Sequence, residues 1–176
     1  QKDSFVLESE LTLQSSSGTS SKNDVSANLF SFNLRYKPVG MHFLKSVSLG
    51  LDRVSGDDPS TEEAEGFSKE FGARHKHHGF YDYDLHKKYF GHSHDGLNEI
   101  NIKANIDILK RTNLLVALHN FRSAVKENHY GSEVNFIFKT KHNDEVASEI
   151  GSVFYFPDQG DEKTLPFFYL MITAGF

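Results

Sequence analysis

Ten residues in the middle of the chain constrain its fold most strongly, because polar and apolar side chains alternate there without a break. The run extends from Glu99 to Ile108. A period of two places every polar side chain on one face of a strand and every apolar one on the other. A helix would spread the isoleucines around its circumference, and β-branched isoleucine favours strands. With the polar connection 109–113 and the apolar run 114–121, this stretch predicts a β-hairpin with one polar and one apolar face.

The same alternation recurs along the chain, and the segments between the alternating runs are long and short in turn. This succession is typical of outer-membrane barrels, which have longer loops at one end and tight turns at the other. We therefore predict an all-β, antiparallel transmembrane β-barrel of about eight strands, which is either a single domain over residues 1–176 or the C-terminal portion of a larger barrel. The predicted strands cover residues 5–14, 29–36, 46–53, 98–108, 114–121, 133–141, 147–156 and 168–176.

Composition excludes several other classes of protein. The chain of 176 residues has a net charge of −5, which gives no electrostatic argument for a nucleic-acid partner. It has no cysteine, so a disulfide scaffold and a thiolate metal site are excluded. No apolar run reaches the roughly eighteen residues of a membrane helix. The mean hydropathy of −0.49 fits a soluble protein, but also a barrel in which half of each strand faces a polar interior. Because Gln1 is neither an initiator methionine nor part of a signal peptide, we expect a processed or excised chain.

Aromatic residues stand near the ends of several predicted strands, at positions that belong to the apolar face. Outer-membrane barrels place aromatic girdles there, at the boundary between lipid and water. The alternative is that these rings fill the core of a soluble barrel. The residues expected in the girdles are Tyr36, Phe121, Phe154, Phe156, Phe168 and Phe176.

The interruption at residues 55–97 is far longer than an ordinary connection, which predicts a functional role for it. We expect an extracellular loop, acidic at first and rich in histidine later, with some strand of its own around residues 74–83. Imidazole and carboxylate groups suit Zn²⁺, Cu²⁺ or Ni²⁺, but no spacing here matches a closed metal site. The weak candidates for metal ligands are His75, His77, His78, His92 and His94.

For catalysis the sequence offers little. His119 and Ser123 have a spacing that could pair a base with a nucleophile, but such a pair is recognised by its geometry and by an orienting acid. We therefore predict that the protein is not an enzyme, and we expect no cofactor.

The polar faces of the predicted strands form the functional surface if the barrel encloses a pore. Charged groups of both signs can line a channel, and the cations among them attract an anionic solute. The alternative is a filled, salt-bridged interior without transport, which requires nearly complete pairing of its charges. The predicted pore-lining residues are Arg35, Asp52, Glu99, Asn101, Lys103, Asn105, Asp107, Glu133, Asn135 and Lys139, to which Glu8, Glu10 and Asn33 belong by the same alternation.

Three stretches, taken in order, resemble a known family. They are LGLDRVSGDD at 49–58, FGARHKHHGFYDY at 71–83 and GLNE at 96–99, followed by HNFR at 119–122 and GSEV at 131–134. This order is similar to the C-terminal part of the alginate-export porins of Gram-negative outer membranes. The resemblance implies a barrel of about eighteen strands, of which this chain supplies eight, and a terminal aromatic residue, Phe176, that serves as an assembly signal. At His77 and His78 the chain departs from the family pattern.

The expected function is that of a porin-like outer-membrane channel for passive passage of a small polar, anionic or oligosaccharide-like solute. The expected partners are the lipid bilayer with its lipopolysaccharide, the solute, and the remaining strands of a larger barrel or other outer-membrane subunits, with no nucleic acid. Two alternatives stay open. One is a small, non-conducting outer-membrane barrel with a structural or surface-interaction role, since eight strands enclose only enough room for side chains. The other is a soluble barrel that binds a ligand or a metal.

Overall fold

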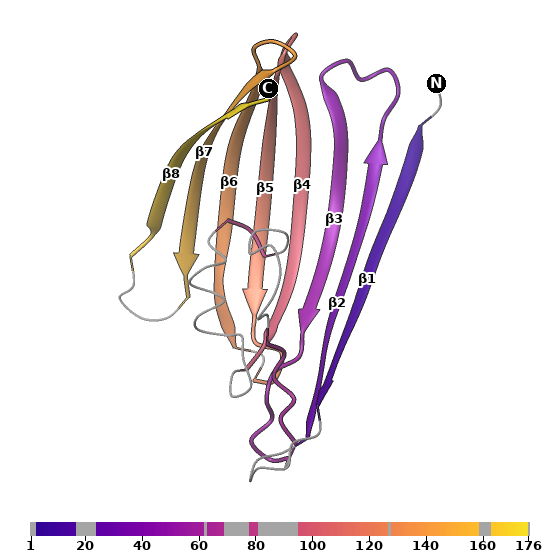
Figure 1. Cartoon of the computed structure of the whole chain (residues 1–176), viewed down its shortest axis with the longest axis vertical. Coiled ribbons are helices and arrows are strands. Elements are labelled where there is room, and N and C mark those ends of the chain that lie inside the picture. Colours follow the sequence, from indigo (N-terminus) through magenta and orange to yellow (C-terminus); the bar gives the residue numbers. More distant parts are fainter. Residues whose placement is uncertain are drawn as a thin grey trace.

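The computed structural model describes residues 3–16, 24–61, 63–68, 78–80, 95–126, 128–158 and 163–175. Eight strands form one antiparallel sheet in which every strand pairs with its neighbours in sequence (Figure 1). The predicted all-β, eight-stranded antiparallel architecture is thereby confirmed. No helix in the described part of the chain is long and apolar enough to cross a membrane. The strands are β1 Ser4–Ser16, β2 Val25–Lys37, β3 Leu44–Val54, β4 Leu97–Leu109, β5 Thr112–Arg122, β6 His129–Lys141, β7 Val146–Pro157 and β8 Leu165–Ala174.

The hairpin expected from the central alternation is the pair β4 and β5. Its register runs from Asn98 opposite Arg122 to Asp107 opposite Asn113. The connection is tighter than the sequence indicated, because only Lys110 and Arg111 lie outside the two strands. A register shift between Asp107 and Leu109 accommodates this short turn.

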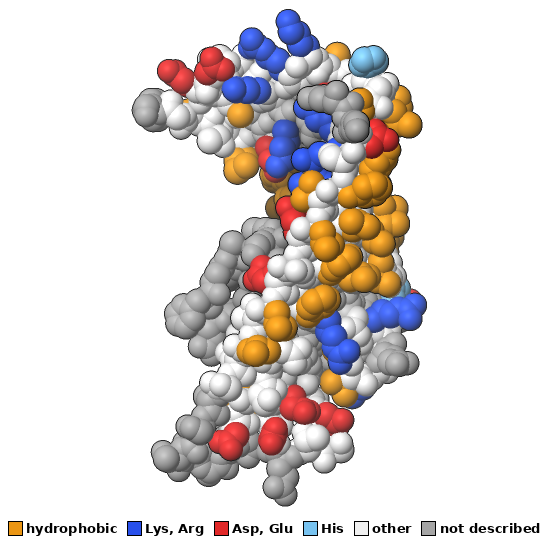
Figure 2. All heavy atoms as spheres, turned by 90° about the vertical axis from the view of Figure 1, so that its right-hand side faces the viewer, with side chains coloured by type: hydrophobic (Ala, Val, Ile, Leu, Met, Phe, Trp, Pro, Cys, Tyr) orange, Lys and Arg blue, Asp and Glu red, His pale blue; other side chains and the backbone are white. Residues whose placement is uncertain are grey.

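The two faces of the sheet differ in chemistry as the alternation predicted. On β4, Ile100 and Ile102 are 55% and 50% exposed, whereas Glu99 and Asn101 on the opposite face are almost completely buried. We call the face of Glu99 and Asn101 the inner face, and the face of Ile100 and Ile102 the outer face. Figure 2 shows apolar side chains along the convex side of the sheet and a hollow on the opposite side. Other exposed apolar residues of the outer face are Phe5, Leu7, Leu11, Leu13, Phe30, Leu34, Leu49, Leu51, Leu118, Phe136, Phe138, Ile150, Phe168, Leu170 and Ile172.

The sheet is curved but not closed. Among the residues that the structure describes, β1 pairs only with β2, and β8 only with β7. Each outermost strand therefore has one edge whose backbone groups bond to no other strand of the sheet. The closed barrel expected from the sequence is not formed by these eight strands.

The connections at one end of the sheet are short, and the other end has the longest one. Residues 38–43, 110–111 and 142–145 make the connections at one end, here called the turn end, where both outermost strands also have their chain termini (Figure 1). The longer connection 55–96 lies at the other end, here called the loop end. Its two ends come into backbone contact, because a Cβ built on Gly56 would overlap the backbone of Asp95 and Gly96. Glycine at position 56 thus permits the long connection to start and finish at one point.

Toward the loop end, the inner face is apolar. Val54, Leu97 and Phe121 are completely buried there, and Phe67 from the long connection packs with them. The expectation that Phe121 belongs to an outward-facing girdle is therefore wrong, because its ring lies on the inner face and stacks on His119 at a centroid distance of 5.8 Å. Successive side chains of β5 point to opposite faces, so Phe121, two residues after His119, must lie on the same inner face as His119. The remaining members of this cluster are Ala27, Leu29, Tyr130 and Tyr155.

Candidate functional site

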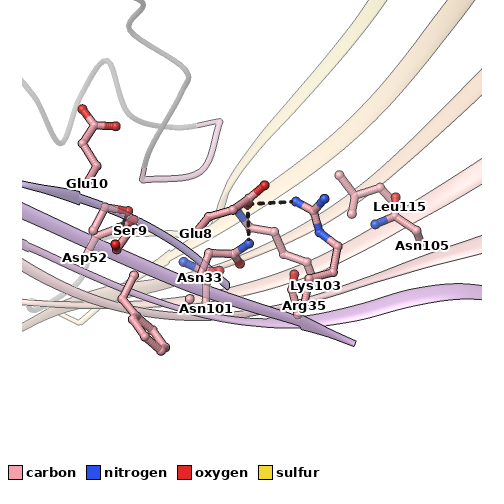
Figure 3. A pocket seen from close by; sticks show the side chains of 14 residues that line it. Glu8, Ser9, Glu10, Asn33, Arg35, Asp52, Asn101, Lys103, Asn105 and Leu115 are labelled. Atoms are coloured by element: carbon pink, nitrogen blue, oxygen red, sulfur yellow. Dashed lines mark hydrogen bonds and ion pairs between the residues drawn. The ribbon is translucent and has the colours of Figure 1, made fainter. Parts of the chain in front are cut away.

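A cavity of about 530 Å³ opens on the inner face over the first five strands (Figure 3). The polar alternation of β1 to β4 produces it, because successive inner positions on each strand carry a carboxylate, an amide, a hydroxyl or a cation. Gly50 lies in its floor, and a Cβ at that position would overlap the Asn101 amide. The cavity is lined by Glu8, Ser9, Glu10, Ser31, Phe32, Asn33, Arg35, Ser48, Gly50, Asp52, Asn101, Lys103, Asn105 and Leu115.

Charges of both signs line this cavity. The Arg35 guanidinium lies 3.3 Å from the Glu8 carboxylate, which also accepts a hydrogen bond of 2.9 Å from the Asn33 amide (Figure 3). Lys103 makes no ion pair with any residue of the described ranges. Its ammonium group is therefore a cationic site on the cavity wall that is available to a solute.

The turn end of the inner face has a second hollow, of about 690 Å³. Several cations surround it, including Lys45, Lys110 and Arg111. Three of its cations are paired with carboxylates: Lys45 lies 3.0 Å from Asp107, Lys139 lies 2.8 Å from Glu149, and Lys141 lies 3.2 Å from Asp144. In Figure 2, most of the blue side chains in view lie toward this end, together with some red ones.

Between the cavity and the apolar loop end lies a buried polar cluster centred on Glu99. One carboxylate oxygen of Glu99 accepts hydrogen bonds from His119 Nδ1 at 2.6 Å and from Asn101 Nδ2 at 2.8 Å. The other oxygen accepts from His78 Nδ1 at 2.8 Å. A buried carboxylate requires such donors, since burial without them costs several kcal/mol. Asp52 on the neighbouring strand extends the cluster, and Ser31 Oγ donates to it.

Residues 78–80 of the long connection dock on this inner face. His78 reaches Glu99 on β4, and the backbone N–H of Phe80 donates to Glu133 on β6 over 2.8 Å. The Phe80 ring stacks on Tyr169 of β8 at a centroid distance of 5.7 Å. Three residues of one connection therefore contact strands from both halves of the sheet. The predicted strand around residues 74–83 lies mostly outside the described residues, and its described part, 78–80, is not a strand.

The structure places all ten predicted pore-lining residues on the inner face, in three groups. Their role as a pore lining stays a prediction. Arg35, Asp52, Asn101, Lys103 and Asn105 border the cavity; Glu99, Glu133 and Asn135 are buried on β4 and β6; and Asp107 and Lys139 border the hollow at the turn end. Glu8, Glu10 and Asn33 also border the cavity.

Of the weak metal candidates, only His78 is described, and it is 3% exposed within the cluster. His75, His77, His92 and His94 lie outside the described residues. His119 contacts Glu99 and not Ser123, whose hydroxyl accepts hydrogen bonds from the backbone of Val125 and Lys126 in the following turn. His119 and Ser123 therefore do not form a base–nucleophile pair: His119 belongs to the Glu99 cluster, and Ser123 stabilises the following turn.

Sequence reasoning missed two parts of this site. It did not associate His78 and His119 with Glu99, although His119 and Glu99 lie on neighbouring inner positions of a hairpin whose register could have suggested their contact. It also missed Phe67, which carries no sequence signal because it belongs to an irregular segment.

In comparisons with known proteins, no family model matches this sequence, and neither a curated protein nor a solved structure matches it. The resemblance to alginate-export porins therefore stays a prediction.

Proposed function

We propose that this chain forms part of the wall of an outer-membrane β-barrel channel that lets a small polar or anionic solute diffuse passively. One observation carries the proposal: apart from the apolar cluster at the loop end, the sheet turns its aliphatic and aromatic side chains outward, while its charges line a cavity on the opposite face. A water-soluble sheet protein does the reverse, because apolar surface is stable only away from water. A hydrocarbon surround stabilises an apolar outer face of this kind.

The strand lengths support a bilayer as the surrounding medium. Strands of 10 to 13 residues are long enough to cross the hydrocarbon core when they are tilted. The exposed apolar residues occur on all eight strands, so the apolar surface is a band and not a local patch. A band around the sheet is typical of lipid contact, whereas a docking site for one protein partner is confined to part of the surface.

The cavity wall supports a polar or anionic solute. Lys103 has no ion-pair partner in the described ranges, although three carboxylates also line its cavity. The hollow at the turn end is bordered by five cations and four carboxylates. Oligosaccharides that carry carboxylates suit such a wall, because its amides and hydroxyls hydrogen-bond sugar hydroxyls while its cations attract the charge.

A complete channel of this kind requires strands beyond the eight described. The unpaired edges of β1 and β8 are where those strands would pair, whether they come from the same barrel or from other outer-membrane subunits. A wider barrel also leaves room for a solute, which eight strands alone do not.

The test is conductance in planar lipid bilayers, combined with charge reversal of Lys103. Lys103→Glu replaces the unpaired cation of the cavity wall, so we expect the reversal potential in a salt gradient to shift toward cation selectivity. Arg122→Glu is the control, because Arg122 is exposed at the loop end of β5 and lies on the outer face. An unchanged reversal potential in Lys103→Glu contradicts the placement of this residue in a conducting lumen.

The apolar cluster at the loop end favours a second candidate function, a non-conducting outer-membrane barrel with a structural or surface-interaction role. Phe67 and the docked residues 78–80 occupy part of the inner face, and a barrel filled in this way conducts nothing. Absence of conductance steps for the protein inserted in a bilayer supports this second function. Solubility without detergent would contradict both functions and favour a soluble ligand- or metal-binding protein.

A further inference from the structure

A histidine from the long connection meets two carboxylates from neighbouring strands at one buried point of the inner face. One possible ligand atom from each of Asp52, His78 and Glu99 lies within 4.8 Å of the other two. His78 Nδ1 is 2.8 Å from the Glu99 oxygen and 3.9 Å from the Asp52 oxygen. We propose that these three side chains bind one divalent transition-metal ion of the Zn²⁺ type. The site does not depend on whether the protein conducts.

The distances are close to those of a metal site. Bonds of about 2.0 to 2.1 Å in a tetrahedral zinc site place neighbouring ligand atoms about 3.3 to 3.4 Å apart. The distance from His78 to Glu99 must widen by about half an ångström, and that from His78 to Asp52 must shrink by about as much. The distance between the ligand oxygens of Asp52 and Glu99, at most 4.8 Å, must reach the same value, and we expect side-chain rotations to supply these shifts.

Each carboxylate presents one oxygen to this point while other donors hold its second oxygen. Ser31 Oγ donates to Asp52 Oδ1. His119 Nδ1 and Asn101 Nδ2 both donate to Glu99 Oε1, at 2.6 and 2.8 Å. Hydrogen bonds of this kind behind the ligands are the means by which proteins orient carboxylates toward a metal ion. The arrangement therefore supplies oriented ligands and not only a cluster of acids.

The charge at this point also suits a divalent cation. Asp52 and Glu99 are 8% and 2% exposed, so two carboxylates share a region with little solvent. Two buried negative charges are costly unless cations or strong donors compensate them. A divalent ion balances both carboxylates, and the neutral imidazole of His78 adds a third ligand without adding charge.

The site has a route for the ion and a preference among metals. Asp52 lines the 530 Å³ cavity as well as the cluster, so hydrated ions reach it from the cavity, and a water molecule completes the coordination. One imidazole nitrogen with two carboxylate oxygens suits Zn²⁺ and its neighbours, whereas Ca²⁺ takes oxygen ligands alone.

The experiment measures metal bound to the full chain in detergent micelles. Protein stripped with a chelator is equilibrated with Zn²⁺ and gel-filtered, and its zinc content is measured by atomic emission; Co²⁺ reports the coordination geometry by visible absorption. We expect one strongly bound ion per chain. Asp52→Asn and Glu99→Gln keep the side-chain size but remove the charge, so each should weaken binding by about a hundredfold or more, since loss of the hydrogen bonds behind a ligand alone costs about 10- to 100-fold.

His78→Ala should also abolish the strong site. Because position 78 lies outside the sheet, this variant still tests the proposal if a strand variant does not fold. Glu149→Gln is the matched control, since Glu149 lies on β7 and bonds to Lys139 and Tyr169. We expect it to bind zinc as the parent chain does. Absence of strong zinc binding in the folded parent overturns the proposal. So does zinc binding that persists in Asp52→Asn and Glu99→Gln, which would place the ion on other histidines.

Discussion

At the scale of single residues, Gly79 illustrates how closely the long connection fits the inner face. Its φ of +75° lies in the left-handed region, which residues with a side chain rarely adopt. A Cβ at this position would also overlap the carboxylate of Glu133. The same carboxylate accepts the hydrogen bond from the Phe80 backbone, so one glycine permits both the turn and the contact.

Gly79→Ala should therefore lower the free energy of unfolding by more than the backbone strain alone accounts for. A left-handed backbone costs about 1 to 2 kcal/mol for a residue other than glycine, and displacement of the buried Glu133 should add about 1 to 2 kcal/mol. Gly40→Ala is the control, because Gly40 has a φ of +93° and no atom within 4 Å of the added Cβ. Urea unfolding followed by circular dichroism measures both losses. Equal losses would show that residues 78–80 do not depend on contact with Glu133.

A second residue-scale prediction concerns Asp3 at the turn end. Its carboxylate accepts hydrogen bonds from Val39 N at 2.6 Å and from the Tyr36 hydroxyl at 2.9 Å. These bonds favour the ionised form and hold the pKa of Asp3 below its ordinary value. Because the folded state has the lower pKa, the stabilisation is complete above the unfolded pKa and is lost as the pH falls through the folded one.

The amide chemical shift of Val39, followed by NMR during an acid titration, reports this bond directly. We expect a transition whose midpoint lies below the ordinary aspartate value of 3.8, and its disappearance in Asp3→Asn. Asp144→Asn is the control, since Asp144 lies in a different turn and pairs with Lys141. A Val39 shift that titrates unchanged in Asp3→Asn would contradict the assignment.

At the scale of the strand, the outer face of β4 tests whether lipid surrounds the sheet. Ile102 lies near the middle of the strand and Ile108 near its end, and both are exposed. Ile102→Arg should cost about 2 to 4 kcal/mol in a bilayer, whereas Ile108→Arg should cost only about 0 to 1 kcal/mol near the interface. Unfolding from liposomes measures the two costs. If both variants lose the same stability, the outer face does not contact hydrocarbon.

The strands were predictable because alternation is a local signal. The sequence indicated all eight and assigned Glu99 and Ile100 to opposite faces, since a period of two depends only on neighbouring residues. Boundaries were less accurate. β1 continues to Ser16, two residues beyond the predicted end, because backbone pairing with β2 does not require apolar side chains. The buried cluster was not predictable, because His78 reaches Glu99 only through the path of a long irregular connection.

At the scale of the whole molecule, the two unpaired edges determine what the chain can form. The chain has no cysteine, so engineered pairs report distances without interference. Ser9→Cys with Leu170→Cys places thiols on β1 and β8, and we expect no cross-link within one chain because the sheet is open. Ser9→Cys with Phe32→Cys is the positive control, since these residues are directly opposite in the β1–β2 register.

Gel electrophoresis under non-reducing conditions separates cross-linking within a chain from cross-linking between chains. Efficient cross-linking of Ser9→Cys with Leu170→Cys inside one chain would mean that eight strands close on themselves. Closure depends on contacts between the first and the last strand, and alternation within single strands carries no information about it. For this reason the sequence predicted the two faces of the sheet, with Phe121 as an exception, while the closure of eight strands is not confirmed.

The docked residues 78–80 also have a mechanical consequence. They link β4, β6 and β8 on the inner face of the sheet. We expect these contacts to contribute to the curvature of the sheet, together with strand twist. A force applied to residues 78–80 would therefore be transmitted to three strands at once.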